Sequence, residues 1–87
     1  MSFLVRRVDD QFGIWNPFDS EFVNPRYLSL SEKEIINYLS QNPFPIDPDY
    51  SIQDLIRDLT RFSGSLIISC RNIETAEFIA KMLYELI

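Results

Sequence analysis

The sequence predicts an α+β fold, in which a small, mostly antiparallel sheet packs against three helices. Two observations support this: strand-like and helix-like segments fall in largely separate stretches, and two helix-start signals occur in the middle of the chain. The chain has 87 residues, which suits one compact domain over residues 1–87 and leaves no room for a second core. An apolar fraction of 46% with only two glycines is typical of a globular protein.

The first part of the chain predicts an N-terminal β-hairpin. Residues 3–8 are rich in apolar and β-branched side chains. The following Asp9-Asp10 pair favours a tight turn, because aspartate tolerates left-handed backbone geometry. Residues 11–15 then return as a second strand, whose side chains alternate between the two faces of the sheet. A short extended piece follows near residue 22.

Two helices have matching start signals. Ser31 is followed by Glu34, and Ser51 by Asp54; in such a capping box each side chain bonds the other residue's backbone N–H. The helices are predicted at about 32–41 and 52–61. The apolar side chains that the first helix is expected to bury are Ile35, Ile36 and Leu39.

The last third of the chain predicts a strand followed by a helix. Residues 66–70 begin with three consecutive apolar residues, which indicates a central strand covered on both faces. A final helix is expected over about 73–87, with Asn72 as its N-cap. Phe78 and Met82 widen the apolar arc of this helix. Two hypotheses remain open for the arc: an interface with another subunit, or contact with the chain's own core.

Three Asn-Pro dipeptides, at positions 16, 24 and 42, predict turns between the elements. Each is followed within two residues by an aromatic side chain. These aromatic residues are expected to pin the loops to the core: Phe18, Tyr27 and Phe44.

The composition argues against most catalytic machinery. The sequence has no histidine and a single cysteine, which excludes Ser-His-Asp and Cys-His arrangements, an internal disulfide and a cysteine-rich zinc site. Cys70 precedes a helix, but a phosphatase-type nucleophile needs an arginine six positions later, where the chain has Ala76. Cys70 is therefore interpreted as a small buried residue. The chain is predicted to be no enzyme and to use no cofactor.

Charge and hydropathy limit the partners. Thirteen acidic against eight basic residues give a net charge of −5, which disfavours binding to nucleic-acid phosphates. No apolar run approaches the roughly 20 residues that span a bilayer. At the N-terminus apolar residues precede the charges, the reverse of a signal peptide. We therefore expect a cytoplasmic protein without membrane contact.

Two groups of carboxylates are the candidate binding residues. The first group lies before and along the second helix: Asp47, Asp49, Asp54 and Asp58. The second combines acids with aromatic side chains near the first turns: Trp15, Phe18, Asp19 and Glu21. A calcium loop is not expected, because Asp47-Pro48-Asp49 lacks the required glycine and final glutamate.

These features predict a small, acidic, non-catalytic protein-binding module, such as an inhibitor, an immunity-type protein or a regulatory adaptor. It would dock on a basic surface of a partner protein, with charge steering the encounter and aromatic side chains providing affinity. Three alternatives remain open. The acids could form a solvated surface only, the chain could be a structural subunit or homodimer that packs through its C-terminal helix, or it could be a metal-dependent enzyme that uses Asp and Glu.

Overall fold

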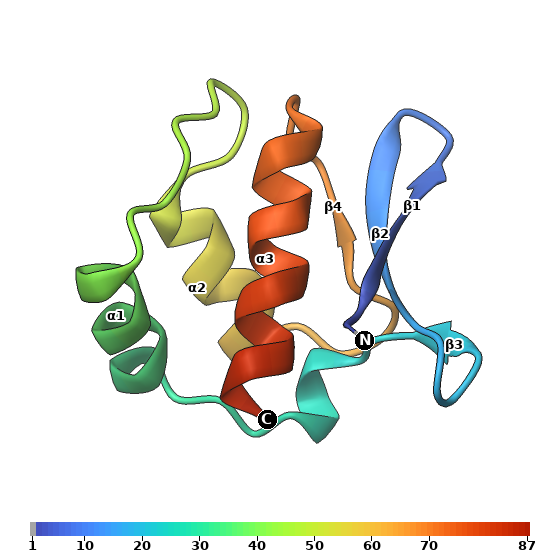
Figure 1. The fold of residues 1–87 in the computed structure, drawn as a ribbon, viewed down its shortest axis with the longest axis horizontal. Coiled ribbons are helices and arrows are strands. Elements are labelled where there is room, and N and C mark those ends of the chain that lie inside the picture. The colour runs from blue at the N-terminus through green and yellow to red at the C-terminus, as the bar shows by residue number, and fades with distance from the viewer. Residues whose placement is uncertain (1) are drawn as a thin grey trace.

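The computed structural model describes residues 2–87, and in these residues it contains four strands, three α-helices and one short 3-10 helix (Figure 1). The α+β class predicted from the sequence is confirmed. The helix ends differ from prediction by one residue at the C-terminal side of two helices. In chain order the elements are β1 (Leu4–Val8), β2 (Gln11–Asn16), β3 (Glu21–Phe22), η1 (Pro25–Tyr27), α1 (Glu32–Gln41), α2 (Ile52–Thr60), β4 (Ile67–Ile68) and α3 (Ile73–Leu86).

Strand β2 occupies the centre of the sheet. β1 pairs antiparallel with it from Leu4 opposite Trp15 to Val8 opposite Gln11. β3 and β4 pair antiparallel with the other edge of β2. The predicted turn is present, with Asp9 at a φ of 55°, in the left-handed region that aspartate tolerates.

The strand predicted at 66–70 is present but shorter and does not lie at the centre of the sheet. β4 comprises Ile67 and Ile68 and pairs with β2 only. Just before it, the Leu66 N–H donates to the Val23 carbonyl, and the Leu66 carbonyl accepts from the Ile14 N–H. The apolar run reflects burial rather than a central position, because Leu66 and Ile68 belong to the core.

Helix α3 lies between the sheet and the other two helices (Figure 1), and it contacts both β1 and β2. Of the two hypotheses for the apolar arc, this position favours contact with the chain's own core at Met82, which is 0% exposed. Phe78 is partly buried and makes edge-to-face contacts with Tyr38 of α1 and Phe44 of the following loop. The apolar arc is therefore covered by the chain's own aromatic side chains.

Helix α1 buries less than the sequence predicts. Ile35 is fully buried and Leu39 is partly buried, but Ile36 is 51% exposed. α1 lies at the outside of the molecule (Figure 1), so only one narrow stripe of its surface meets the rest of the chain. The capping box of Ser31 and Glu34 forms as predicted.

Within the described part of the chain, no helix combines the length and the apolar character needed to cross a membrane. The longest, α3, has 14 residues, against the roughly 20 that a bilayer requires.

Candidate functional site

The first predicted carboxylate, Asp47, is bonded to the start of α3. Its Oδ2 accepts hydrogen bonds from the Asn72 N–H and from the Thr75 hydroxyl, both at 2.9 Å. The Arg71 N–H lies 3.1 Å from both oxygens, and the Asp49 N–H donates to Oδ1. Burial raises the pKa of this carboxyl, but the backbone donors stabilise its charged form more strongly and lower the pKa to about 2.

Asp47 therefore caps a helix to which it does not belong. Asn72 occupies the predicted N-cap position, but its side chain makes no capping hydrogen bond. The carboxylate of Asp47 satisfies backbone donors at this end instead, where negative charge is favoured. Next to it, Asp49 forms an exposed ion pair of 3.1 Å with Arg71.

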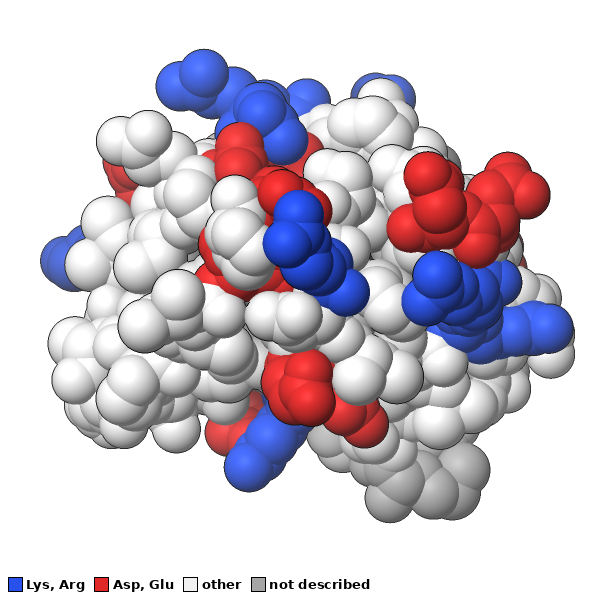
Figure 2. Space-filling view, turned by 90° about the horizontal axis from the view of Figure 1, so that it is seen from above, with Lys and Arg blue, Asp and Glu red and all other residues white. Residues whose placement is uncertain are grey.

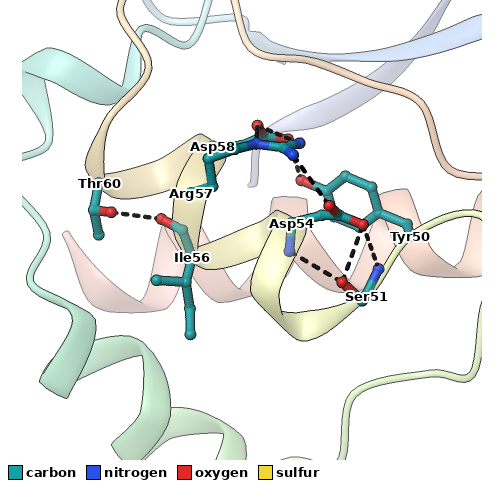
Figure 3. A network of polar contacts seen from close by, with 7 residues as sticks. All are labelled: Tyr50, Ser51, Asp54, Ile56, Arg57, Asp58 and Thr60. Atoms are coloured by element: carbon teal, nitrogen blue, oxygen red, sulfur yellow. Dashed lines mark hydrogen bonds and ion pairs between the residues drawn. The ribbon is translucent and has the colours of Figure 1, made fainter.

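The other two acids of the first group form a network along α2 (Figure 3). Asp54 closes the capping box with Ser51. Asp58 accepts a short hydrogen bond from the hydroxyl of Tyr50, a buried residue. Arg57 forms ion pairs with both carboxylates at 3.1 Å. Burial, followed by the hydrogen bond to Asp58, raises the pKa of Tyr50 above its usual range.

All four acids of the first group are thus engaged within the chain, and the side chain of Asp58 is only 16% exposed. Basic and acidic side chains also intermix on the face seen from above, where blue and red atoms adjoin (Figure 2). The surface over α2 and its preceding loop is therefore not uniformly acidic, because Arg57 and Arg71 lie among its carboxylates.

The second group includes an exposed aromatic pair. Phe18 is 55% exposed, although the sequence predicts that it pins its loop to the core. The Asn16 side-chain oxygen accepts a hydrogen bond from the Phe18 N–H in a local turn. This turn places the Phe18 ring near the end of α3. There it stacks on Tyr84, with 6.4 Å between ring centroids and planes 14° apart.

A surface hollow lies near this aromatic pair, and Phe3, which packs edge-to-face on Tyr84, belongs to its lining. The hollow has a volume of about 240 Å³, and its lining includes Asp19, Glu21, Tyr27 and Ile87. Tyr27 is 80% exposed. Among residues 2–87, no ion pair involves Asp19 or Glu21. We call this surface the acidic aromatic patch; its residues are Phe18, Asp19, Glu21, Tyr27, Tyr84 and Ile87.

The candidate binding residues predicted from the sequence include three residues of this patch, Phe18, Asp19 and Glu21, and omit Tyr27, Tyr84 and Ile87. The sequence does contain a signal that Tyr84 is exposed, because Tyr84 lies on the same polar side of α3 as Lys81 and Glu85. For Tyr27 the Asn-Pro turn was the signal, but the turn directs the ring outward. Of the three aromatics that follow Asn-Pro, Phe44 alone meets the expectation by packing on Phe78.

Trp15 was predicted in the same group, but it lies on another surface. The Arg6 guanidinium lies 4.5 Å from the centre of its ring system, and Phe22 packs edge-to-face against it. Trp15 lines a groove between β1 and α3 and does not line the hollow of the acidic aromatic patch.

Cys70 behaves as the sequence indicates. It is a free, buried thiol, and burial, with a smaller contribution from the charge of Asp47, raises its pKa to about 11. At neutral pH it is therefore a protonated core residue and a poor nucleophile.

Over residues 2–87, no three His, Cys, Asp or Glu side chains lie close enough together to hold a metal ion. The arrangement of the acidic aromatic patch is suited to non-covalent contact, with rings for packing and carboxylates for charge. Comparisons of this chain with protein-family models, with curated proteins and with solved structures found no significant match.

Proposed function

We propose that this protein is a small, acidic, non-catalytic binding module that docks through the acidic aromatic patch on a basic surface of a partner protein. An inhibitor, an immunity-type protein and a regulatory adaptor all work in this way. The observation that carries the proposal is the stacked, exposed pair of Phe18 and Tyr84 near two carboxylates, Asp19 and Glu21, that form no ion pair within residues 2–87.

The aromatic side chains support the proposal through the energetics of interfaces. Large rings that are already held in place lose little conformational entropy when a partner covers them, and aromatic residues are enriched among the residues that dominate binding energy. Phe18 is held by the Asn16 turn and by Tyr84. The adjoining hollow beside Tyr27 could receive a side chain of the partner.

The carboxylates support the proposal through charge. The protein carries a net charge of −5, and Asp19 and Glu21 have no cationic neighbour within ion-pair distance in the described residues. Such charges attract lysine and arginine side chains of a partner and accelerate encounter, with an effect that weakens as salt rises. The first group of acids is less suited, because Arg57 and Arg71 already neutralise it in part.

The proposal is tested by comparative affinity capture from the native source, followed by mass spectrometry. Three baits are used: the wild-type chain, Phe18→Ser and the control Ile46→Ser, which alters a side chain that is 95% exposed in a different loop. We expect a protein that the wild type and Ile46→Ser retain and that Phe18→Ser loses. Equal recovery on all three baits, or no specific protein on the wild type, contradicts the proposal.

A further inference from the structure

Strand β1 has one free edge. It pairs with β2 along its whole length, and the described residues include no strand on its other side. A free edge carries backbone N–H and C=O groups without partners, which another chain can pair with. Natural sheets often protect such edges with charged residues, proline or a covering segment.

The hydrogen-bond pattern identifies which groups are free. The Ile14 N–H donates to Leu66 and the Ile14 carbonyl accepts from Val23, so both groups point away from β1. Because antiparallel pairs alternate between hydrogen-bonded and non-bonded positions, Val5, opposite Ile14, directs its own N–H and C=O outward. The N–H and C=O of Arg7, two residues further along β1, point outward for the same reason.

A groove runs along this free edge. Its volume is about 610 Å³, and it is lined by β1 on one side and by α3 on the other. The residues of α3 in the groove include Ile73, Glu77, Ala80 and Lys81. The exposed apolar side chains of Leu4 and Ile73 lie at its border. An extended chain placed here would pair with β1 and contact α3 with alternate side chains.

The charge of this edge differs from the charge of the whole protein. Arg6 and Arg7 adjoin on β1, and neither forms an ion pair within residues 2–87. Each is held over an aromatic ring instead, Arg6 over Trp15 and Arg7 over Phe12. On the side of the β1–β2 hairpin, basic side chains gather next to acidic ones (Figure 2). An incoming strand would thus meet two positive charges on opposite faces.

We propose that the β1 edge binds an extended, acidic segment of a partner protein as an additional strand, with its carboxylates opposite Arg6 and Arg7 and with separate apolar residues over Leu4 and over Ile73. A second copy of this chain fits less well. The antiparallel register that pairs the whole of β1 with its copy places Arg6 opposite Arg6, and like charges in that position are destabilising. The groove and the hollow of the acidic aromatic patch have Phe3 in common, but none of the six patch residues lines the groove.

The probe is a phage-displayed library of random linear heptapeptides, selected against the monomeric wild-type chain at low salt. We expect selected peptides in which Asp or Glu alternates with β-branched residues. Amide hydrogen exchange of the wild-type chain then locates the binding: the Val5 and Arg7 amides, which exchange freely alone, become protected by the peptide. The Leu4 and Arg6 amides are bonded to β2 and are protected in both states.

Two variants separate backbone pairing from charge. Arg7→Pro removes the arginine side chain and the outward N–H, at a place where an edge strand tolerates proline; Arg7→Thr removes the same side chain, with its charge and its contact with Phe12, but keeps the N–H. Loss of one backbone hydrogen bond should make binding to Arg7→Pro about fivefold or more weaker than binding to Arg7→Thr. If Arg7→Pro does not fold, the hydrogen-exchange result on the wild type decides. Arg6→Glu is expected to reduce the excess of acidic residues in the selected peptides, because Arg7 then faces a negative charge on the neighbouring residue.

Three results would overturn the proposal: no peptide enriched above background, selected peptides without excess acidic residues, or peptides that protect amides outside β1. Val5 and Arg7 amides already protected in a dimer, seen by light scattering without peptide, would show that a second copy occupies the edge instead.

Discussion

The hydroxyl group of Thr75 donates a 2.9 Å hydrogen bond to the carboxylate of Asp47, 28 residues earlier in the chain. Thr75 is fully buried, and the same carboxylate oxygen accepts the N–H of Asn72. This contact joins the proline-containing loop before α2 to the first turn of α3. It makes Asp47 a structural residue, although the sequence alone suggests a carboxylate free for binding.

Replacing Asp47 should destabilise the fold. Asp47→Asn puts an NH₂ group where an oxygen now accepts N–H and O–H donors, so that donors at the α3 terminus lose their partner. We expect the free energy of unfolding in urea to fall by about 1–3 kcal/mol. Asp9→Asn is the matched control, because it makes the same charge change at an exposed turn whose positive φ asparagine tolerates. An unchanged stability of Asp47→Asn would show that the cap contributes nothing.

The same carboxylate gives stability a specific pH dependence. The pKa of Asp47 is about 2 in the folded protein, against 3.8 for an aspartate without these contacts, as in the unfolded chain. The unfolded chain therefore takes up the proton first as the pH falls. The contribution of Asp47 is therefore complete above about pH 5 and is lost as the pH falls through about 2. Urea unfolding of wild type and Asp47→Asn at a series of pH values should show a stability difference that shrinks in this range. A constant difference down to pH 2 contradicts the assignment.

A substitution at Met82 distinguishes a core role of this part of α3 from a role in an interface with another subunit. Because the side chain of Met82 is fully buried between the sheet and the other helices, Met82→Ala should lower the free energy of unfolding by about 2–5 kcal/mol. Lys81→Ala, at a neighbouring exposed position, should change it by less than about 0.5 kcal/mol. If Met82→Ala instead kept the stability and altered the molar mass in light scattering, the helix would serve an interface.

Gly13 has no room for a side chain. A Cβ atom there would collide with the ring of Phe22 and touch Ile67, and Phe22 cannot move freely because it packs against Trp15. Gly13→Ala should therefore cost about 1–3 kcal/mol of stability through overpacking. In a Phe22→Ala background the cost should fall, because the colliding ring is gone. Equal costs in both backgrounds would mean that the collision is not the cause.

Local sequence signals predicted the local structure well. The capping pairs of Ser31 with Glu34 and Ser51 with Asp54 form as expected, because they depend on residues only three positions apart. The hairpin turn at Asp9 depends in the same way on local backbone preference. These elements sufficed to predict the α+β class.

The errors concern relationships between distant residues. Periodicity places Met82 on an apolar stripe, but only the packing of α3 against both the sheet and the helices decides that the stripe is covered. The acid Asp47 has the same local sequence whether it is free or bonded to Thr75. Conversely, the exposure of Phe18 and its contact with Tyr84 follow from how the hairpin meets the end of α3.

The central claim is that Asp19 and Glu21 guide a basic partner to the acidic aromatic patch. The most direct test measures the affinity of the captured partner at increasing salt for the wild type, Asp19→Asn/Glu21→Gln and the equal-charge control Asp9→Asn/Asp10→Asn. We predict that affinity falls with salt for the wild type and the control, and that the patch variant binds more weakly with a shallower salt dependence. If the control weakens binding as much as the patch variant, or if salt has no effect on the wild type, the claim is wrong.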